Sequence, residues 1–586
     1  MSSGAELKSD SSFGVGQTDG CSSSDIQTAV IPTEIHRTGR WRSFKDSFKR
    51  AEDKHDVSSD QDGLEKAIHK TADNNLNRSL KKRQLQMITL GGCVGSGLFI
   101  GVGSALHSGG PAGLLISWSI VSSFLYCTMQ ALAELAALYP ISGSFSTYAT
   151  RFVDPSWGFA VGWNYAIFWV VVLPLELVAS SMTINYWASD INSVAWVAIF
   201  YVLIIGLNLC GNKGFGETEF VASVIKVLGI IGFNILAIIL ICGGGGHAGF
   251  IGAKYWHNPG PFAYGAKGVI SVLITATYSL AGTELVGLTS AESEGNPRIV
   301  LPKAIKQVFW RILLFYMITL TLVGFLVPFN SKRLIGSSTD SSASPFVIAI
   351  KDAQIKVLPS IFNVIVLVSL LSIGNSSVYG FSRTILSLAE QGLAPKIFDY
   401  VDRKGRPLVG ILTSAIVGLL SFVAASPKQT EVFAWLMALS GLSTLFTWFS
   451  VNLCHIRFRM AMKKQNRSLR ELPYRALTGF WGSVYAAVLL FTVLCLQFWI
   501  SLFPLGAKPD AQKFFENYLG AVVVLVFFIG HKIYSRKLNT VVPLETMDLD
   551  SGRRETDVDK LVQELEEEKE SKRAAPWYKK VLDFLV

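Results

Sequence analysis

The sequence has little charge and few cysteines for its length. Asp, Glu, Lys and Arg make up 16% of its 586 residues, whereas a typical soluble domain carries about 25%. A chain this long with so few charges does not match a set of soluble domains. Cys21 lies near the N-terminus, and the other six cysteines lie in or beside apolar runs. This arrangement predicts no structural disulfide framework.

Signatures of catalysis and of direct ATP use are also missing. The histidines are scattered without metal-ligand spacing, and no GxxxxGK[ST] phosphate-binding loop is present. The net charge of +10 comes from basic residues clustered in short loops beside apolar runs. We therefore predict a protein that is not an enzyme, needs no metal or cofactor and does not bind nucleic acid.

What the sequence does contain is a series of apolar runs of about 20 residues, the length that crosses about 30 Å of hydrocarbon. Hydrophobic residues make up 50% of the chain, and their runs predict an all-α polytopic membrane protein. The twelve predicted transmembrane helices are 86–106, 112–138, 160–187, 193–210, 218–242, 268–290, 308–328, 358–388, 408–425, 431–452, 480–503 and 515–535.

Basic residues predict which side of the membrane the loops face. Three connections are rich in them, and the one after the tenth predicted span carries Arg457, Arg459, Lys463, Lys464, Arg467, Arg470 and Arg475. By the positive-inside rule, these loops and both termini are cytosolic. We therefore expect a disordered cytosolic tail at 1–84, a transporter domain at 85–538 and a cytosolic C-terminal tail at 539–586.

The first predicted span contains five glycines within eleven positions, in GGCVGSGLFIG at residues 91–101. Glycine disfavours a helix by about 1 kcal/mol, and unpaired backbone groups are costly in hydrocarbon. We expect a broken helix whose N–H groups at Ser96 and Gly97 attract an anion and whose carbonyls near Cys93 attract a cation. Such a pocket fits an amino acid zwitterion, although close helix packing would also explain the glycines.

The sixth predicted span is interrupted at the corresponding place. Ala281, Gly282 and Thr283 break it in mid-membrane, and Glu284 follows at once. A carboxylate at that depth costs about 3 kcal/mol, so it should face a wet cavity. Two interrupted spans at matching positions predict a transporter built from inverted repeats, at about 86–242 and 268–452, with extra helices at 480–535.

Several stretches resemble the fungal amino acid permeases of the amino acid–polyamine–organocation superfamily, and most of all the general amino acid permeases of yeasts. They include LQMITLGGCVGSGLFIGVGSAL at 85–106, ELAALYPISGSFSTYATRFVDP at 134–155, VVLPLELVASSMTINYW at 171–187, YSLAGTELVGLTSAES at 278–293 and LSGLSTLFTW at 439–448. A further match runs from 374 to 411. The resemblance implies the leucine-transporter fold, with two inverted five-helix repeats, broken helices 1 and 6 and two extra helices.

The same resemblance implies a substrate site at the two breaks. The substrate α-carboxylate would meet backbone N–H groups, and its α-ammonium would meet backbone carbonyls. Tyr278 would form an aromatic gate, although it could also be a packed interfacial aromatic. We expect Gly97→Leu to abolish uptake and leave folding intact, because a side chain would fill the carboxylate space. The implied substrate-binding residues are Cys93, Gly95, Ser96, Gly97, Tyr278, Ser279, Ala281 and Gly282.

Three charged residues inside predicted spans are candidates for coupling uptake to protons. Lys226 lies about one-third of the way along the fifth span, beside the place where sodium-coupled relatives of this fold hold their ion. A positive charge there would exclude sodium and could carry a proton, unless the side chain snorkels to the surface. Glu284 and Glu176 could each bind the coupled proton, because burial favours a protonated carboxyl. Glu284 ranks first because it adjoins a break.

These features predict a plasma-membrane permease that takes up L-amino acids together with protons, with broad specificity. An amino acid sensor and a carrier of another amine, such as a polyamine or S-adenosylmethionine, are the alternatives. The resemblance also implies removal from the surface by ubiquitin-ligase machinery. The expected acceptors in the N-terminal tail are Lys45, Lys49, Lys54, Lys66 and Lys70.

Overall fold

The structure, a computed structural model, describes most of the chain from Val94 to Arg536 and a few segments outside it. The described residues are 47–50, 83–84, 87–88, 94–141, 143–187, 191–244, 249–289, 292, 305, 307–335, 344–425, 429–536, 541–551, 553, 570 and 576. In these residues the fold is helical, and the one β-bridge joins Arg50 to Asp402.

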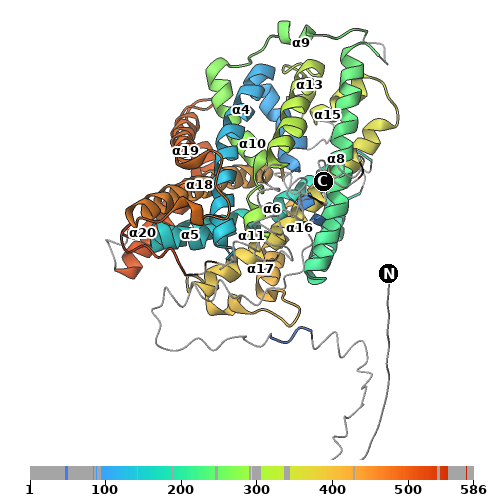
Figure 1. Cartoon of the computed structure of the whole chain (residues 1–586). Coiled ribbons are helices and arrows are strands. Elements are labelled where there is room, and N and C mark those ends of the chain that lie inside the picture. The colour runs from blue at the N-terminus through green and yellow to red at the C-terminus, as the bar shows by residue number, and fades with distance from the viewer. Residues whose placement is uncertain are drawn as a thin grey trace, which may run out of the picture. The chain divides into compact units, whose positions relative to one another are not determined.

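Figure 1 shows the helices of the described residues. In chain order they are η1 (Gly97–Gly101), α4 (Val102–Leu138), α5 (Ser144–Phe152), α6 (Pro155–Ile184), α7 (Ser193–Leu209), α8 (Asn212–Ile241), α9 (Lys254–His257), α10 (Gly265–Leu280), α11 (Leu285–Thr289), η3 (Ile312–Ile318), α13 (Thr319–Leu326), α14 (Lys332–Ile335), α15 (Pro345–Asp352), α16 (Leu358–Glu390), η5 (Lys396–Asp399), α17 (Leu408–Gly418), η6 (Leu419–Ala425), α18 (Gln429–Lys464), η7 (Leu469–Glu471), α19 (Gly479–Leu502) and α20 (Ala511–Ser535).

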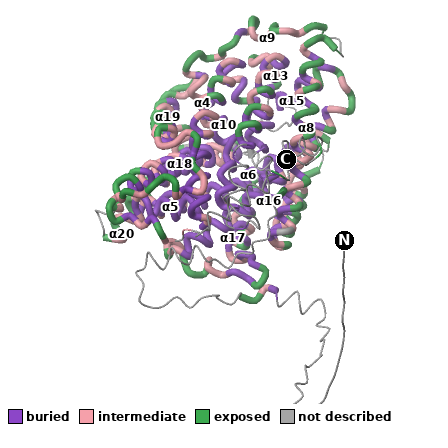
Figure 2. Tube along the Cα trace, in the orientation of Figure 1, coloured by how far each residue is buried: buried purple, intermediate pink, exposed green. Residues whose placement is uncertain are grey.

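Exposure of apolar helices indicates a membrane protein. In the described part of the chain, nine helical segments are long and apolar enough to cross a bilayer, and two shorter apolar helices accompany them. In α6, 78% of the most apolar window is buried, but in α20 only 17% is buried. Figure 2 shows this contrast between the buried centre at α6 and α16 and the exposed α20. Apolar helix faces of this size are stable when lipid covers them, whereas contact with water would be unfavourable.

Each predicted span overlaps a described helix, with two differences in detail. The first two spans lie on η1 and α4, which are continuous except at Gly110, where φ is 73° and ψ is 172°. The tenth span was predicted to end at 452, but α18 continues to Lys464. Four basic residues assigned to the following loop therefore lie on α18 instead. The helix can continue because its nearly buried cation, Arg459, is compensated by Glu134 at 2.6 Å, and Lys463 and Lys464 are exposed.

A short helix that the sequence analysis did not predict covers the first broken span. The α15 helix is buried, and Phe346 packs edge-on against Phe99 with ring centroids 5.4 Å apart. Just before α15, the Ser344 hydroxyl donates to the Phe99 carbonyl at 2.7 Å. These contacts hold η1 in place at Phe99.

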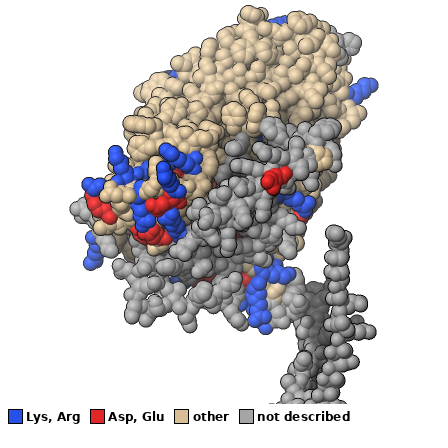
Figure 3. All heavy atoms as spheres, in the orientation of Figure 1, with Lys and Arg blue, Asp and Glu red and all other residues tan. Residues whose placement is uncertain are grey.

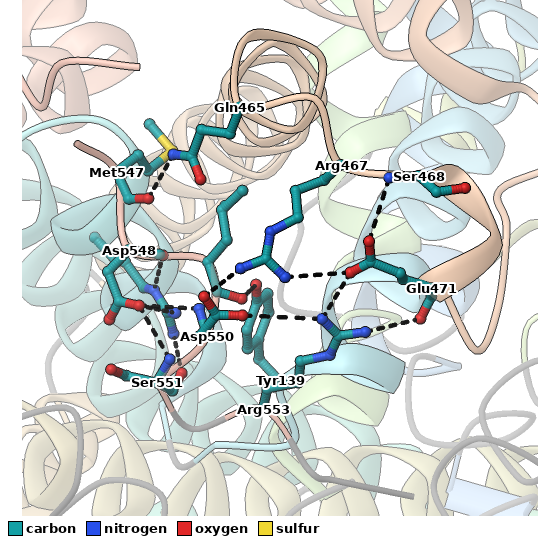
Figure 4. Close-up of polar contacts among 12 residues, drawn as sticks. Tyr139, Gln465, Arg467, Ser468, Glu471, Met547, Asp548, Asp550, Ser551 and Arg553 are labelled. Carbon is teal, nitrogen blue, oxygen red and sulfur yellow. Dashed lines mark hydrogen bonds and ion pairs between the residues drawn. The ribbon is translucent and has the colours of Figure 1, made fainter. Parts of the chain in front are cut away.

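Residues 541–551 and Arg553, here called the C-terminal strap, lie against the ends of several helices (Figure 4). The Tyr139 hydroxyl donates to the Leu549 carbonyl at 2.7 Å. Arg151 donates to the backbone carbonyls of Asp548 and Ser551 at 2.8 and 2.6 Å. From the strap, Arg553 pairs with Glu471 at 2.9 Å. The strap is thus held largely by hydrogen bonds to charged side chains.

We expect the strap to detach as the pH falls. The hydrogen bond from Arg553 lowers the pKa of Glu471. Burial alone would raise the pKa of Asp548, but the Arg151 charge and backbone N–H groups lower it overall. Groups with lowered pKa values stabilise the docked state above their ordinary pKa, and this contribution is lost as the pH falls through the lowered values. A spin label at exposed Thr546 should sharpen its spectrum between about pH 7 and about pH 3.

The control for this experiment is the Glu471→Gln/Asp548→Asn variant, labelled at the same position. Its label should already be mobile at neutral pH and should change little on acidification. A wild-type spectrum that stays broad throughout the titration would show that these carboxylates do not hold the strap.

Candidate functional site

The helix of the first span starts at the predicted break. Val94 and Gly95 are not helical, Ser96 caps η1, and the N–H groups of Leu98 and Phe99 bond to the Gly95 carbonyl at 3.1 and 3.0 Å. Ser96 and Gly97 therefore stand in the first turn, where N–H groups have no intrahelical partner. Cys93, which was assigned a carbonyl contact to substrate, lies outside the described residues.

The second break lies between α10 and α11. Ala281 is extended, with φ −62° and ψ 155°, and Gly282 has φ 86°, a left-handed value that glycine adopts readily. The backbone groups that lack a helical hydrogen bond at this break bond to other partners, because an unpaired backbone group is costly inside a membrane. The Ser279 carbonyl accepts from the Tyr316 hydroxyl at 2.7 Å, and the Gly282 N–H donates to Glu284 at 3.1 Å.

The two breaks touch each other through a glycine. A Cβ atom added at Gly97 would lie 2.6 Å from the Ser279 Cα and 3.0 Å from its backbone nitrogen. Backbone atoms cannot move aside as a flexible side chain can. Gly97 therefore serves close packing of the first span on α10, and this contact corrects the expectation that Gly97→Leu leaves folding intact.

We expect even Gly97→Ala to destabilise the protein, by about 1–3 kcal/mol, as overpacking does in well-packed cores. Thermal unfolding of the detergent-solubilised protein would measure this effect. Gly232→Ala on α8 is the matched control, because nothing lies within 4 Å of its added Cβ. Equal thermal stability of the two variants would contradict the tight contact between the breaks.

A cavity of about 20 Å³ lies where the two breaks meet α6 and α16. That volume holds about one water molecule, so an amino acid fits only after the surrounding side chains move. Five of the predicted substrate-binding residues line it, but Ser279 and Gly282 do not. The lining consists of Gly95, Ser96, Gly97, Phe168, Trp169, Val172, Glu176, Tyr278, Ala281 and Ile373.

Glu176 is the only acidic residue among the described residues of this lining, and it joins three helices. Its Oε1 accepts from the Ser96 hydroxyl at 2.5 Å and from the Tyr278 hydroxyl at 3.0 Å. The two hydroxyls are 3.0 Å apart. Its Oε2 is buried and has no hydrogen-bond partner among the described residues. A buried carboxylate oxygen without a donor is strongly disfavoured, so this atom is suited to take up a proton or a cationic group.

The structure gives Glu284 a different environment. Its Oε1 accepts from Gly282 and, at 3.4 Å, from Tyr165, and its Oε2 accepts from the Trp448 indole at 3.1 Å. Both oxygens therefore already have donors, and Glu284 does not line the cavity. This geometry suits a group that stabilises the second break.

Lys226 is fully buried on α8 and faces α16. Its Nζ donates to the Ser372 hydroxyl at 2.8 Å, and that hydroxyl donates to Glu219 at 2.6 Å. Ser372 is followed directly by Ile373, which lines the cavity. Neighbouring residues of one helix therefore connect the buried ammonium to the cavity wall.

The sequence analysis missed several residues around the site. Phe168, Trp169 and Val172 face the cavity from α6, and Glu219 pairs indirectly with Lys226. The three cavity residues lie in an apolar span in which periodicity does not distinguish them from lipid-facing neighbours. Glu219 carried a usable signal, because it is a carboxylate seven residues before Lys226 in the same apolar segment.

Two further buried ionic groups lie away from the cavity. Glu292 accepts from Arg383 at 2.9 Å and from Asn212 at 2.6 Å. Glu134 accepts from Arg459 at 2.6 Å and lies 3.0 Å from His455. Each group joins segments that are far apart in the sequence.

Comparison with known proteins identifies the family. The model of the amino acid permease family matches residues 84–541. The amino-acid permease GAP6 of Candida albicans is 63% identical over 561 residues, which cover 95% of this chain and 98% of the relative. The general amino-acid permease GAP1 of Saccharomyces cerevisiae is 52% identical over 560 residues, with coverages of 94% and 93%. The histidine permease of the same yeast is 48% identical over 545 residues, with coverages of 92% and 88%. The chain therefore belongs to the amino acid permease family and is a membrane transporter of amino acids, not an enzyme.

Proposed function

We propose that this protein is a plasma-membrane permease that takes up L-amino acids of several kinds together with protons. The observation that carries the proposal is Glu176, a buried carboxylate in a cavity formed by two broken helices. It is hydrogen-bonded to Ser96 of the first break and Tyr278 of the second. The proposal includes twelve spans in the inverted-repeat fold and cytosolic termini, as the basic loops predict.

The two breaks supply opposite polarities for the substrate. The helix that starts at Ser96 presents N–H groups and a positive dipole end to the α-carboxylate. The α10 helix ends at Leu280, and its carbonyl end favours the α-ammonium. Of the carbonyls at this end of α10, that of Tyr278 already accepts from the Ala281 N–H at 3.1 Å. The Ala281 carbonyl, in the cavity wall, is therefore the better contact.

Glu176 couples substrate to proton in this mechanism. When Glu176 is protonated, its bonds to Ser96 and Tyr278 rearrange, because a protonated carboxyl donates as well as accepts. Because a neutral carboxyl can stay buried beside a zwitterionic substrate, the proton and the substrate occupy the closed site together and leave it together when the cavity opens to the cytosol. Lys226 keeps a positive charge on the α8–α16 side, which disfavours a sodium ion there.

The cavity must open for transport. Tyr278, Trp169 and Phe168 enclose its small volume, so the structure represents a closed arrangement around the site. We expect these aromatics to move when substrate enters, and a mainly apolar wall accommodates different side chains. This wall supports broad specificity.

Uptake of labelled amino acids in cells lacking their own permeases tests the function. We expect uptake to rise as the external pH falls, to collapse with a protonophore, and to be unchanged when choline replaces external sodium. A sodium requirement would overturn the proton mechanism. Binding without uptake would identify a sensor, and uptake of polyamines or S-adenosylmethionine alone would identify another amine carrier.

Ubiquitin attachment to the N-terminal lysines remains a prediction. Among the five proposed acceptors the structure describes only Lys49, whose backbone carbonyl accepts from the Arg403 N–H at 2.9 Å. The other four lie outside the described residues.

A further inference from the structure

A second cavity, a groove of about 870 Å³, lies between the end of α18 and the start of α19. This volume falls within the roughly 300–1,000 Å³ of small-molecule sites. The groove is remote from the substrate cavity and shares no lining residue with it. Its walls are Arg459, Met460, Lys463, Lys464, Asn466, Arg467, Leu469, Phe480, Trp481 and Leu544.

The lining is strongly basic. Its described residues include four cations and no acidic side chain. Two of these cations are paired with carboxylates outside the groove, Arg467 with Glu471 and Asp550, and Arg459 with Glu134. Lys463 is exposed and makes no ion pair within the described part of the chain, and Lys464 has only a long, exposed pair with Glu545 at 3.4 Å. Arg459 is 8% exposed, and its Nε has no hydrogen-bond partner among the described residues. The Arg459 Nε is itself buried, so the donors that the groove offers to an anion are the ammonium groups of Lys463 and Lys464.

The other wall is apolar and exposed. Trp481 is 77% exposed, and its ring meets Phe480 edge-on with centroids 5.5 Å apart. Both residues stand in the first turn of α19, a helix apolar and long enough to cross a membrane. Aromatic side chains at such a position lie at the level of the lipid headgroups.

The position of the groove fits the distribution of charge on the surface. Figure 3 shows Lys and Arg, with some Asp and Glu, gathered on the face that carries α18 and α20, whereas the surface above is almost uncharged. The uncharged zone corresponds to apolar helix faces, so the charged zone marks the edge of the membrane. A groove at this edge can take a ligand that is charged at one end and apolar at the other.

We propose that this groove binds an acidic phospholipid, with the phosphate at Lys463 and Lys464 and the acyl chains beside Trp481. Basic pockets between transmembrane helices are suited to such headgroups. The start of α19 adds further N–H donors for the phosphate. A soluble phosphate compound would gain nothing from the exposed tryptophan.

Native mass spectrometry of the purified full-length protein tests the proposal. Phosphatidylinositol 4-phosphate, phosphatidylserine or phosphatidylcholine is added at equal concentration. We expect the two acidic lipids to be retained about tenfold more than phosphatidylcholine, given the attraction of basic residues for anionic lipids. The Lys463→Gln/Lys464→Gln variant should lose most of this preference. Both lysines are exposed, so the variant should fold normally.

Matched controls separate the groove from general surface charge. Lys508→Gln/Lys513→Gln removes two exposed lysines beyond the other end of α19 and should leave lipid binding unchanged. Trp481→Ala should weaken retention of all acidic lipids. Equal retention of phosphatidylcholine, or unchanged binding by the Lys463/Lys464 variant, would overturn the proposal.

Two further outcomes would also overturn it. If soluble inositol 1,4-bisphosphate displaces the lipid at equal concentration, the groove recognises a free phosphate and not a lipid. If acidic lipid binds only after the chain is truncated behind Arg553, the acidic C-terminal segment is the natural occupant. Retention of acidic lipid by the intact chain, lost with the two lysines, supports the lipid site.

Discussion

Glu176→Gln is expected to abolish proton-driven accumulation of amino acids while leaving the folded protein at the cell surface. Glutamine has nearly the same shape and keeps an oxygen to accept from Ser96 and Tyr278, but it cannot gain or lose a proton. Loss of a proton-transferring group reduces rates by about 100-fold or more. Uptake should fall accordingly and lose its dependence on external pH, whereas exchange of internal for external amino acid should persist. Uptake and counterflow in proteoliposomes measure the two activities separately.

Glu284→Gln is the matched control, because it removes an equally buried carboxylate that does not line the cavity. Its donors include the Trp448 indole, so the variant should yield less folded protein. Each surviving molecule should still respond to pH. The opposite pattern, with coupling lost in Glu284→Gln and kept in Glu176→Gln, would place the proton at the second break.

Lys226→Met is expected to lower the amount of folded protein sharply. Lys226 and Glu219 share the Ser372 hydroxyl in a buried site, so removal of the ammonium leaves a buried carboxylate without its counter-charge. Breaking a buried charge pair in this way costs about 3–5 kcal/mol. Surface quantity and thermal stability of a fluorescent fusion would measure the loss.

Adding Glu219→Gln to Lys226→Met should restore the surface quantity, because the site then holds no unpaired charge. If Lys226 takes part in ion selection, the double variant should remain folded and yet show altered proton coupling or gain a response to sodium. A folded double variant with wild-type pH dependence and no sodium response would confine Lys226 to a structural role.

Much of the architecture could be predicted from the sequence because its physical signals are local. Apolar run length indicated the spans, and the glycines at 91–101 and 281–283 indicated the breaks. These signals are local because each segment must pair its own backbone N–H and C=O groups inside the hydrocarbon. The end of α18 was misplaced because its charges are compensated by distant partners such as Glu134.

The site was harder to predict because it depends on contacts between distant residues. Glu176 and Glu284 are both carboxylates in apolar spans, and nothing in their local sequence shows which one reaches the cavity. The difference arises from tertiary donors, namely Trp448 and Tyr165 at Glu284 but only Ser96 and Tyr278 at Glu176. Gly97 shows the same limit, since its neighbour Ser279 lies on another helix.

The contact between Gly97 and Ser279 also has a mechanical consequence. Two helices whose backbones approach this closely cannot slide or tilt past one another without a clash, so the first span and α10 should move as a single rigid body. The hinge surfaces of the transport cycle should then lie elsewhere, where α6 and α16 meet this body, as at the side-chain contacts of Glu176 with Ser96 and Tyr278. Distances between probes on the first span and α10 should stay constant through the cycle, while distances from either helix to α16 should change.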